Sequence, residues 1–164
     1  MKILGIDLSL RATGLALLGP GGLEFYDWVP TKPDEVEDEE IPRLVFERIQ
    51  TKLNPHTIVA IETPVLGRSV NTAFRQGILL GGLVALIRGT STRSCVFIHP
   101  LQTKAAVGAR VHKAKILAHK VDPKEEVVRL VTARFPELAQ LSPKPRREAI
   151  CDAVAVALAG EILR

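Results

Sequence analysis

Two acidic residues end apolar stretches of the sequence that are typical of buried strands. Asp7 follows Ile-Leu-Gly-Ile, and Glu62 follows Ile-Val-Ala-Ile shortly before Pro64 stops the stretch. An ionised carboxylate is costly to bury without a partner, and binding sites in open α/β sheets form where strands end. We therefore interpret both acids as candidate ligands of a cation. The alternatives remain that Asp7 caps a turn and that Glu62 is structural.

A third acid lies in an apolar segment near the end of the sequence. Asp152 is flanked by Ala, Ile, Cys and Val residues, in a segment predicted to be a helix that packs on the sheet. Glu148 precedes it by four residues, so the two lie on one helix face and repel each other by roughly 0.2–0.5 kcal/mol. A bound cation would reverse that repulsion. The alternative is that the pair faces solvent near the helix N-terminus, where acids are favoured.

The four acids define the expected chemistry. Oxygen ligands favour a hard cation, Mg²⁺ or Mn²⁺, and acids from distant positions suit two cations spaced for phosphodiester hydrolysis. We predict that Asp7 bridges two Mg²⁺ ions and that Glu62 completes one of the sites. Asp152, together with Glu148, is expected to complete the other.

A basic segment accompanies the acids. The formal net charge is +4, and residues 104–124 hold six Lys or Arg, whereas residues 34–40 hold six acids. A basic stretch of this kind suits a polyanionic partner, although a solvated face is the alternative. The residues that we expect to face the phosphate backbone of DNA are Lys104, Arg110, Lys113, Lys115 and Lys124.

These residues must be positioned by an α/β fold. Apolar and β-branched stretches predict strands at residues 2–8, 13–19, 23–29, 57–62 and 94–98. Helices are predicted near residues 42–53, 69–88, 101–107, 123–135 and 145–163, with Asn71 as an early cap of the second. Antiparallel strands followed by strand–helix–strand crossovers predict a mixed five-stranded sheet with helices on both faces.

Composition limits the classes of protein to be considered. A chain of 164 residues, 46% apolar and 24% charged, fits a single globular domain over residues 1–164. Cys95 and Cys151 form no CxxC motif, which argues against a zinc site and suits a reducing compartment. The longest apolar run, residues 77–87, is too short to span a bilayer. We therefore expect a cytoplasmic protein.

The segment 69–88 carries an unusual set of glycines. Gly77, Gly81 and Gly82 lie inside a predicted helix, where each costs about 1 kcal/mol relative to Ala. The surrounding residues are apolar on every side of the helix, and one sheet can cover only one side. We predict a two-fold homodimer interface along this helix. The alternative is that the glycines only let the helix lie close to its own sheet.

The motifs, taken in order, resemble those of RuvC-type Holliday junction resolvases, members of the RNase H-like superfamily. The matching segments are Gly5–Leu17, Ile61–Pro64, Pro100–Gly108, Lys124–Val128 and Asp152–Leu158. The resemblance covers essentially the whole chain. It implies an RNase H-like fold, a homodimer and Mg²⁺-dependent paired nicking of four-way DNA junctions. It also implies that Asp7, Glu62 and Asp152 are ligands, and that Lys104 and Lys124 lie near the DNA backbone.

Several positions depart from the pattern of that family. Leu8-Ser9 follows Asp7 where bacterial members usually have Pro-Gly, and Ala149 stands where a fourth acid is common. Val65 and Leu66 stand where an aromatic wedge usually follows the second acid, and residues 109–121 are expected to form an enlarged basic loop. We therefore expect a divergent, phage-type member of the family.

Three other functions are alternatives to this interpretation. Kinases of the ASKHA class also begin with Gly-Ile-Asp and a hairpin, but they need two large lobes that 164 residues cannot supply. A non-catalytic nucleic-acid-binding module on the same fold would have no need of three acids near phosphates. An RNase H-like nuclease that acts on hybrids or on other branched DNA remains open.

Overall fold

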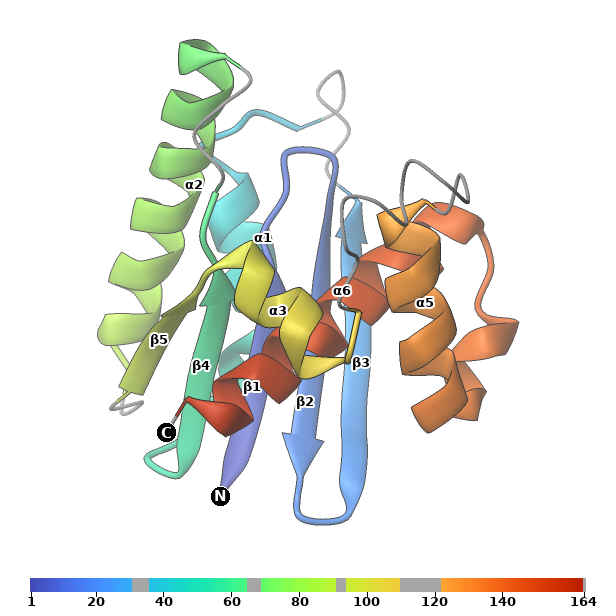
Figure 1. Cartoon of the computed structure of the whole chain (residues 1–164). Coiled ribbons are helices and arrows are strands. Elements are labelled where there is room, and N and C mark those ends of the chain that lie inside the picture. Colours follow the sequence, from blue (N-terminus) through green and yellow to red (C-terminus); the bar gives the residue numbers. More distant parts are fainter. Residues whose placement is uncertain (31–35, 65–68, 91–93, 110–121, 164) are drawn as a thin grey trace.

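The computed structural model describes residues 1–30, 36–64, 69–90, 94–109 and 122–163. Five strands form one sheet in the order β3-β2-β1-β4-β5 (Figure 1). The strands are β1 (Lys2–Asp7), β2 (Ala12–Gly19), β3 (Gly22–Pro30), β4 (Thr57–Glu62) and β5 (Ser94–Ile98). Pairing is antiparallel from β1 through β2 to β3 and parallel from β1 through β4 to β5, which confirms the predicted mixed sheet.

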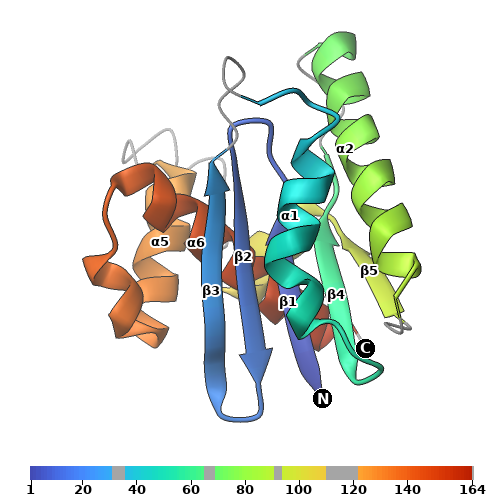
Figure 2. The same ribbon diagram turned by 180° about the vertical axis from the view of Figure 1, so that it is seen from behind.

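Helices cover both faces of the sheet, as predicted. They are α1 (Ile41–Ile49), α2 (Val70–Arg88), α3 (Pro100–Ala106), α5 (Pro123–Arg134) and α6 (Lys144–Ile162), with short 3₁₀ helices at Gln50–Lys52 and Pro136–Gln140. One face carries α3, α5 and α6 (Figure 1), and the other carries α1 and α2 (Figure 2). Each layer of helices has its own apolar core against the sheet.

Two glycines let α6 lie directly on the central strand β1 and on its neighbour β2. A Cβ atom on Gly5 of β1 would lie 2.2 Å from the carbonyl oxygen of Ala153, and one on Gly14 of β2 would lie 1.8 Å from that of Ala149. Both distances are far below a normal contact, so larger residues at these positions would push α6 away from the sheet. The glycines therefore fix the position of α6, which carries Asp152.

Helix α2 buries few of its residues, and these are Leu79, Leu83 and Ile87. Its N-cap is Ser69, whose Oγ accepts a hydrogen bond from the Thr72 amide at 3.1 Å, so the prediction of Asn71 as the cap was wrong. The helix is longer than the apolar run within it, and by length and composition alone it could cross a membrane. It packs on the sheet through Leu79, Leu83 and Ile87, however, and is therefore part of this fold.

Candidate active site

The three acids singled out from the sequence line one cavity of about 510 Å³. Asp7 ends β1 and Glu62 ends β4, and these strands are parallel neighbours in which Ile6 pairs with Ile61. Both carboxylates therefore leave the sheet at the same edge. Asp152 reaches the same cavity from α6, which crosses the sheet beside them.

Burial and like charge act together on these carboxylates. Burial raises the pKa of Asp7 well above its usual value, and the negative charges of Asp152 and Glu62 raise it further. Burial likewise raises the pKa of Asp152 to about 6, although the ammonium group of Lys124 opposes this shift. The Nζ atom of Lys124 lies 3.7 Å from Oδ2 of Asp152. Among the described residues that line the cavity, three carboxyl groups thus share the space with one lysine, and their mutual repulsion favours a bound cation.

A buried threonine holds Glu62. The Thr103 hydroxyl, from α3, donates a 2.7 Å hydrogen bond to Oε2 of Glu62. Burial raises the pKa of Glu62, and the Thr103 hydrogen bond and the charge of Lys104 act in the opposite direction. Thr103 could not be singled out from the sequence, because an isolated threonine in a helix has no distinctive pattern. The pairing of Glu62 with Ile98 in β5, just before α3, is the feature that brings the two together.

Glu148 lies one helical turn before Asp152 and does not line the cavity. Its Oε1 atom lies 3.5 Å from Nζ of Lys144, which also donates a 3.3 Å hydrogen bond to Glu125. The negative charge of Glu148 still contributes to the raised pKa of Asp152. Its role as a fourth ligand remains a prediction, and such a role would require Glu148 to leave Lys144.

The basic residues predicted to meet DNA are distributed unevenly. Lys124, at the start of α5, lines the cavity. Lys104, on α3, lies close enough to lower the pKa of Glu62 but does not line the cavity. Arg110, Lys113 and Lys115 lie outside the described residues, as do Val65 and Leu66.

The donor set fits a hard cation, because each of the three side chains offers carboxylate oxygens. Among the described residues, no three His, Cys, Asp or Glu side chains form a group compact enough to hold a metal ion. The three carboxylates therefore face a common space without meeting at one point. Binding of a cation would have to draw them together.

The opposite wall of the cavity was not anticipated from the sequence. It is formed by the first two turns of α2, where Ser69, Thr72, Ala73 and Gln76 face the space that the carboxylates enclose. The spacing of three and four residues between these positions was the available signal, since it places them on one face of the predicted helix. The cavity is therefore acidic on one side and carries neutral polar groups on the other.

Comparison with known proteins places this arrangement in a family. No protein-family model matches the chain. The crossover junction endodeoxyribonuclease RuvC of Chlorobium phaeovibrioides is 30% identical over 166 residues, which cover 96% of this chain and 79% of that protein. This relative is similar to the chain in sequence over nearly its whole length.

Solved structures share the fold. The RuvC of T. thermophilus in complex with a Holliday junction substrate has a TM-score of 0.69 at 24% identity, covering 97% of this chain and 91% of that one. A second Thermus thermophilus RuvC structure has a TM-score of 0.67 at 23% identity, covering 97% and 92%. The Fowlpox virus resolvase, in complex with Holliday junction DNA, has a TM-score of 0.58 at 12% identity and covers both chains fully.

The matches bear out both the expected fold class and the resemblance found in the sequence motifs. The mixed sheet, with antiparallel strands first and helices on both faces, is the RNase H-like fold of these proteins. The sequence relationship extends over nearly the whole chain and over most of the relative. The chain therefore belongs to the RuvC family of crossover junction endodeoxyribonucleases.

Proposed function

We propose that this protein is an endonuclease that resolves four-way DNA junctions by paired, metal-dependent hydrolysis of phosphodiester bonds. The observation that carries the proposal is the cavity that Asp7, Glu62 and Asp152 line together, in a chain of the RuvC family. Its RuvC relative is by name a crossover junction endodeoxyribonuclease, and two of the similar structures contain junction DNA.

Asp7, Glu62 and Asp152 are the residues that we propose to hold Mg²⁺, with Mn²⁺ as a substitute. Bound there, such ions would activate the attacking water and stabilise the leaving oxygen of the phosphodiester. Lys124 lies at the cavity, where its ammonium group would attract the phosphate of the strand to be cut. Thr103 would keep Glu62 in one orientation.

The two free cysteines and a DNA substrate also fit a protein that works in the cytoplasm. Lys104, together with the basic segment that includes Arg110, Lys113 and Lys115, is proposed to bind the phosphate backbone on either side of the cut.

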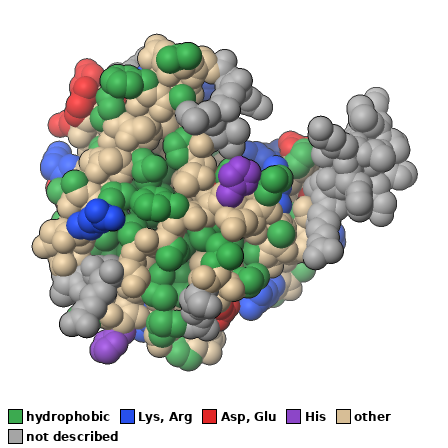
Figure 3. Space-filling view, turned by 60° about the vertical axis from the view of Figure 1, so that its left-hand side comes forward, with side chains coloured by type: hydrophobic (Ala, Val, Ile, Leu, Met, Phe, Trp, Pro, Cys, Tyr) green, Lys and Arg blue, Asp and Glu red, His purple; other side chains and the backbone are tan. Residues whose placement is uncertain are grey.

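We further propose that the protein works as a homodimer formed along α2. The outer side of this helix exposes 90% of Val70, 67% of Phe74 and 39% of Ile78. In Figure 3, where the side carrying α2 is turned forward, hydrophobic side chains gather over this part of the surface. A soluble chain with such a patch gains by covering it with a second copy.

The space around the glycines of α2 supports the dimer over the alternative explanation given for them. A Cβ atom on Gly77 or on Gly81 would meet nothing within 4 Å. The chain's own sheet therefore does not require these two glycines. Of the three glycines, Gly82 is the one that packing within the chain explains, because a Cβ atom added there would lie 3.0 Å from Cγ of Pro42 in α1. Gly77 and Gly81 are thus free to let the backbone of a second α2 approach closely.

One experiment tests the nuclease proposal. Labelled four-way junctions, linear duplex and RNA–DNA hybrid are incubated with the protein, with and without Mg²⁺. We expect paired nicks in the junction only, and only with Mg²⁺. Asp7→Asn should bind the junction as tightly as the native protein and lose cleavage by orders of magnitude.

Each of the other outcomes identifies an alternative. Junction binding without cleavage at any Mg²⁺ or Mn²⁺ concentration would identify a binding module. Cleavage confined to the hybrid would identify an RNase H-like enzyme of another kind. Cleavage retained by Asp7→Asn would remove Asp7 from the catalytic site.

A further inference from the structure

One face of α2 is apolar in the C-terminal half of the helix and polar in the N-terminal half. Residues 69, 72, 76, 79, 83 and 87 recur every three or four positions and so share one face of the helix. In the C-terminal half, Leu79, Leu83 and Ile87 of this stripe are buried in the apolar core. In the N-terminal half, the stripe continues as Gln76, Thr72 and Ser69, which line the cavity.

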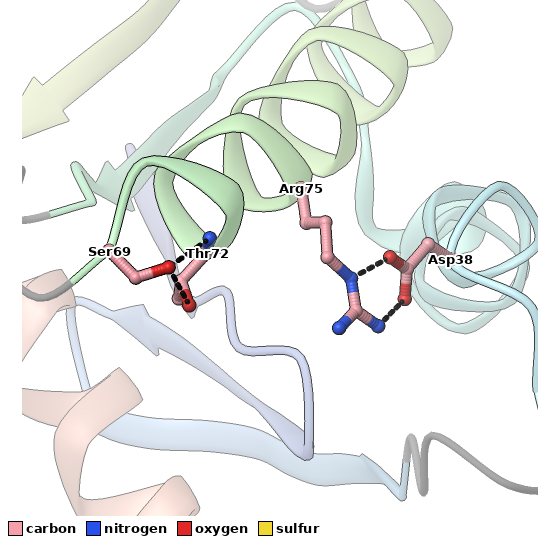
Figure 4. A network of polar contacts seen from close by, with 4 residues as sticks. All are labelled: Asp38, Ser69, Thr72 and Arg75. Carbon is pink, nitrogen blue, oxygen red and sulfur yellow. Dashed lines mark hydrogen bonds and ion pairs between the residues drawn. The ribbon is translucent and has the colours of Figure 1, made fainter.

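This change has a physical consequence. Ser69 and Thr72 are exposed to solvent, whereas Gln76, one turn further along the helix, is partly buried. A partly buried polar side chain loses hydration and gains nothing unless a polar partner faces it. Ser69 and Thr72 have partners, because Oγ of Ser69 accepts hydrogen bonds from the amide and from the hydroxyl of Thr72 (Figure 4). Gln76 has no hydrogen-bond partner among the described residues. It lines the same cavity as the three carboxylates.

Two residues close to Gln76, Arg75 and Ala73, offer no polar group to a ligand on the side of the cavity formed by α2, so the amide of Gln76 can reach such a ligand. Arg75 turns away and forms a bidentate ion pair with Asp38, in the segment before α1 (Figure 4). Ala73, also at the cavity, has no polar group and leaves room. Among the described residues, the side of the cavity formed by α2 therefore offers an amide that both donates and accepts hydrogen bonds, and no charged group that would hold a phosphate.

We propose that Gln76 contacts a base of the DNA strand beside the cleaved phosphodiester, and thereby sets the sequence preference of cleavage. The inference rests on the proposed nuclease function and assigns this residue its part in it. The edges of bases present donors and acceptors that a carboxamide can match in pairs. Lys124 and the basic segment would instead bind phosphates, and such contacts position the DNA without recognising its sequence.

The experiment uses a library of four-way junctions in which the three nucleotides on either side of the exchange point are randomised. Cleaved products are sequenced for the native protein, Gln76→Leu and Gln76→Glu. Gln76→Leu keeps the size and the helix propensity, and it extends the apolar stripe. Gln50→Leu is the matched control, because Gln50 is exposed in the 3₁₀ helix before β4, at the opposite end of that strand from the cavity.

For the native protein, we expect the best and the worst base at one position to differ in cleavage by roughly 5- to 150-fold, the range of one paired base contact. Gln76→Leu should reduce that ratio to about twofold at this position alone, and Gln76→Glu should favour a different base there. Gln50→Leu should keep the native profile. The slope of log affinity against log salt, measured in an Asp7→Asn background, should not change with Gln76→Leu, because no phosphate contact is lost.

Three results would overturn the inference while the proposed function stands. They are a native protein that cuts all junction sequences equally, a Gln76→Leu profile identical to the native one, and a Gln76→Leu variant that is slower on every sequence by the same factor. A native protein that cuts no junction in the library would instead overturn the proposed function itself. Thermal unfolding of each variant, expected at the native temperature, separates misfolding from a change in recognition.

Discussion

Thr103 is the residue whose role follows most directly from a single contact. Its hydroxyl fixes one oxygen of Glu62, and an oriented ligand loses less freedom when a cation binds. We expect Thr103→Val, which keeps the shape and removes the hydroxyl, to raise the Mg²⁺ concentration for half-maximal cleavage by roughly 10- to 100-fold. Thr103→Ser should restore most of the native value.

A second measurement separates this role from a change in stability. Binding of Mn²⁺, followed by electron paramagnetic resonance without DNA, should weaken in Thr103→Val in proportion to the Mg²⁺ requirement. If Mn²⁺ affinity stays native while cleavage falls, Thr103 serves the packing of α3 and does not position Glu62.

The raised pKa of Asp152 makes a prediction about stability. Without metal, the folded protein holds the proton of this carboxyl up to about pH 6, whereas the unfolded chain releases it near 3.8. The contribution of Asp152 to the free energy of unfolding is therefore full below pH 3.8 and is lost as the pH rises through about 6. Asp152→Asn should raise the unfolding temperature at pH 8 by several degrees, because each kcal/mol corresponds to roughly 2–4 °C in a chain of this size.

The matching experiment adds metal and a control. Mg²⁺ should raise the unfolding temperature of the native protein at pH 8 and have little effect on Asp152→Asn. Glu37→Gln, which neutralises an exposed acid before α1, should leave both effects as in the native protein. A native protein more stable at pH 8 than Asp152→Asn, in the absence of metal, would contradict the repulsion described for this cavity.

How far the sequence could predict the site depended on the kind of residue. Asp7, Glu62 and Asp152 could be singled out because a carboxylate among apolar neighbours is conspicuous. Thr103 and Gln76 could not, because polar residues on helices are ordinary and only the packing of α3 and α2 brings them to the cavity. For Glu148, the spacing indicated that it shares a face of α6 with Asp152, but it did not indicate that Glu148 pairs with Lys144.

At the scale of elements, the packing of α6 on the sheet positions Asp152. Gly5→Ala would place a Cβ atom 2.2 Å from the carbonyl oxygen of Ala153, so the helix must shift. We expect a loss of about 1–3 kcal/mol in the free energy of unfolding, as for other overpacked cores, and a loss of cleavage larger than the loss of folded protein. The unfolding of Gly5→Ala in denaturant and its cleavage rate would be measured together.

The control for this change is another glycine of the same chain. A Cβ atom on Gly21, in the turn between β2 and β3, would meet nothing within 4 Å. Gly21→Ala should therefore leave stability and cleavage close to native. Equal effects of the two substitutions would show that the contact between Gly5 and Ala153 does not position α6.

The elements themselves were largely predictable, and the reason is physical. Apolar runs with Pro or Gly at their ends predicted each strand of the sheet to within a residue or two, because the central strands are buried on both faces. The cap of α2 was misassigned, because Ser69 and Asn71 are both good caps and two residues apart. Close packing through Gly5 and Gly14 was not predicted, since it depends on which helix crosses which strand.

At the scale of the whole molecule, α2 has three sides with different partners. Leu79 and Leu83 face the core, Gly82 and Arg75 face α1 and the segment before it, and Phe74 faces outward. The first two sides are satisfied within one chain. The third has apolar residues and small ones together, which is the composition that close helix pairing needs. A two-fold pair would also present two identical cavities, matching the two equivalent strands that a four-way junction offers.

This arrangement leads to a prediction about assembly. Phe74→Arg should convert the proposed dimer to a monomer, because an arginine placed against its two-fold mate would bring two like charges into an apolar interface. Ile162→Arg is the control, because Ile162, near the end of α6, is exposed to the same extent, 67%, as Phe74. Light scattering at micromolar concentration should give a dimer for the native protein and for Ile162→Arg.

Phe74→Arg should nick one strand of a junction without the paired second cut, since a monomer holds one cavity. A Phe74→Arg variant that stays dimeric would place the interface elsewhere, and a monomeric native protein that makes paired cuts would separate paired cleavage from dimer formation altogether.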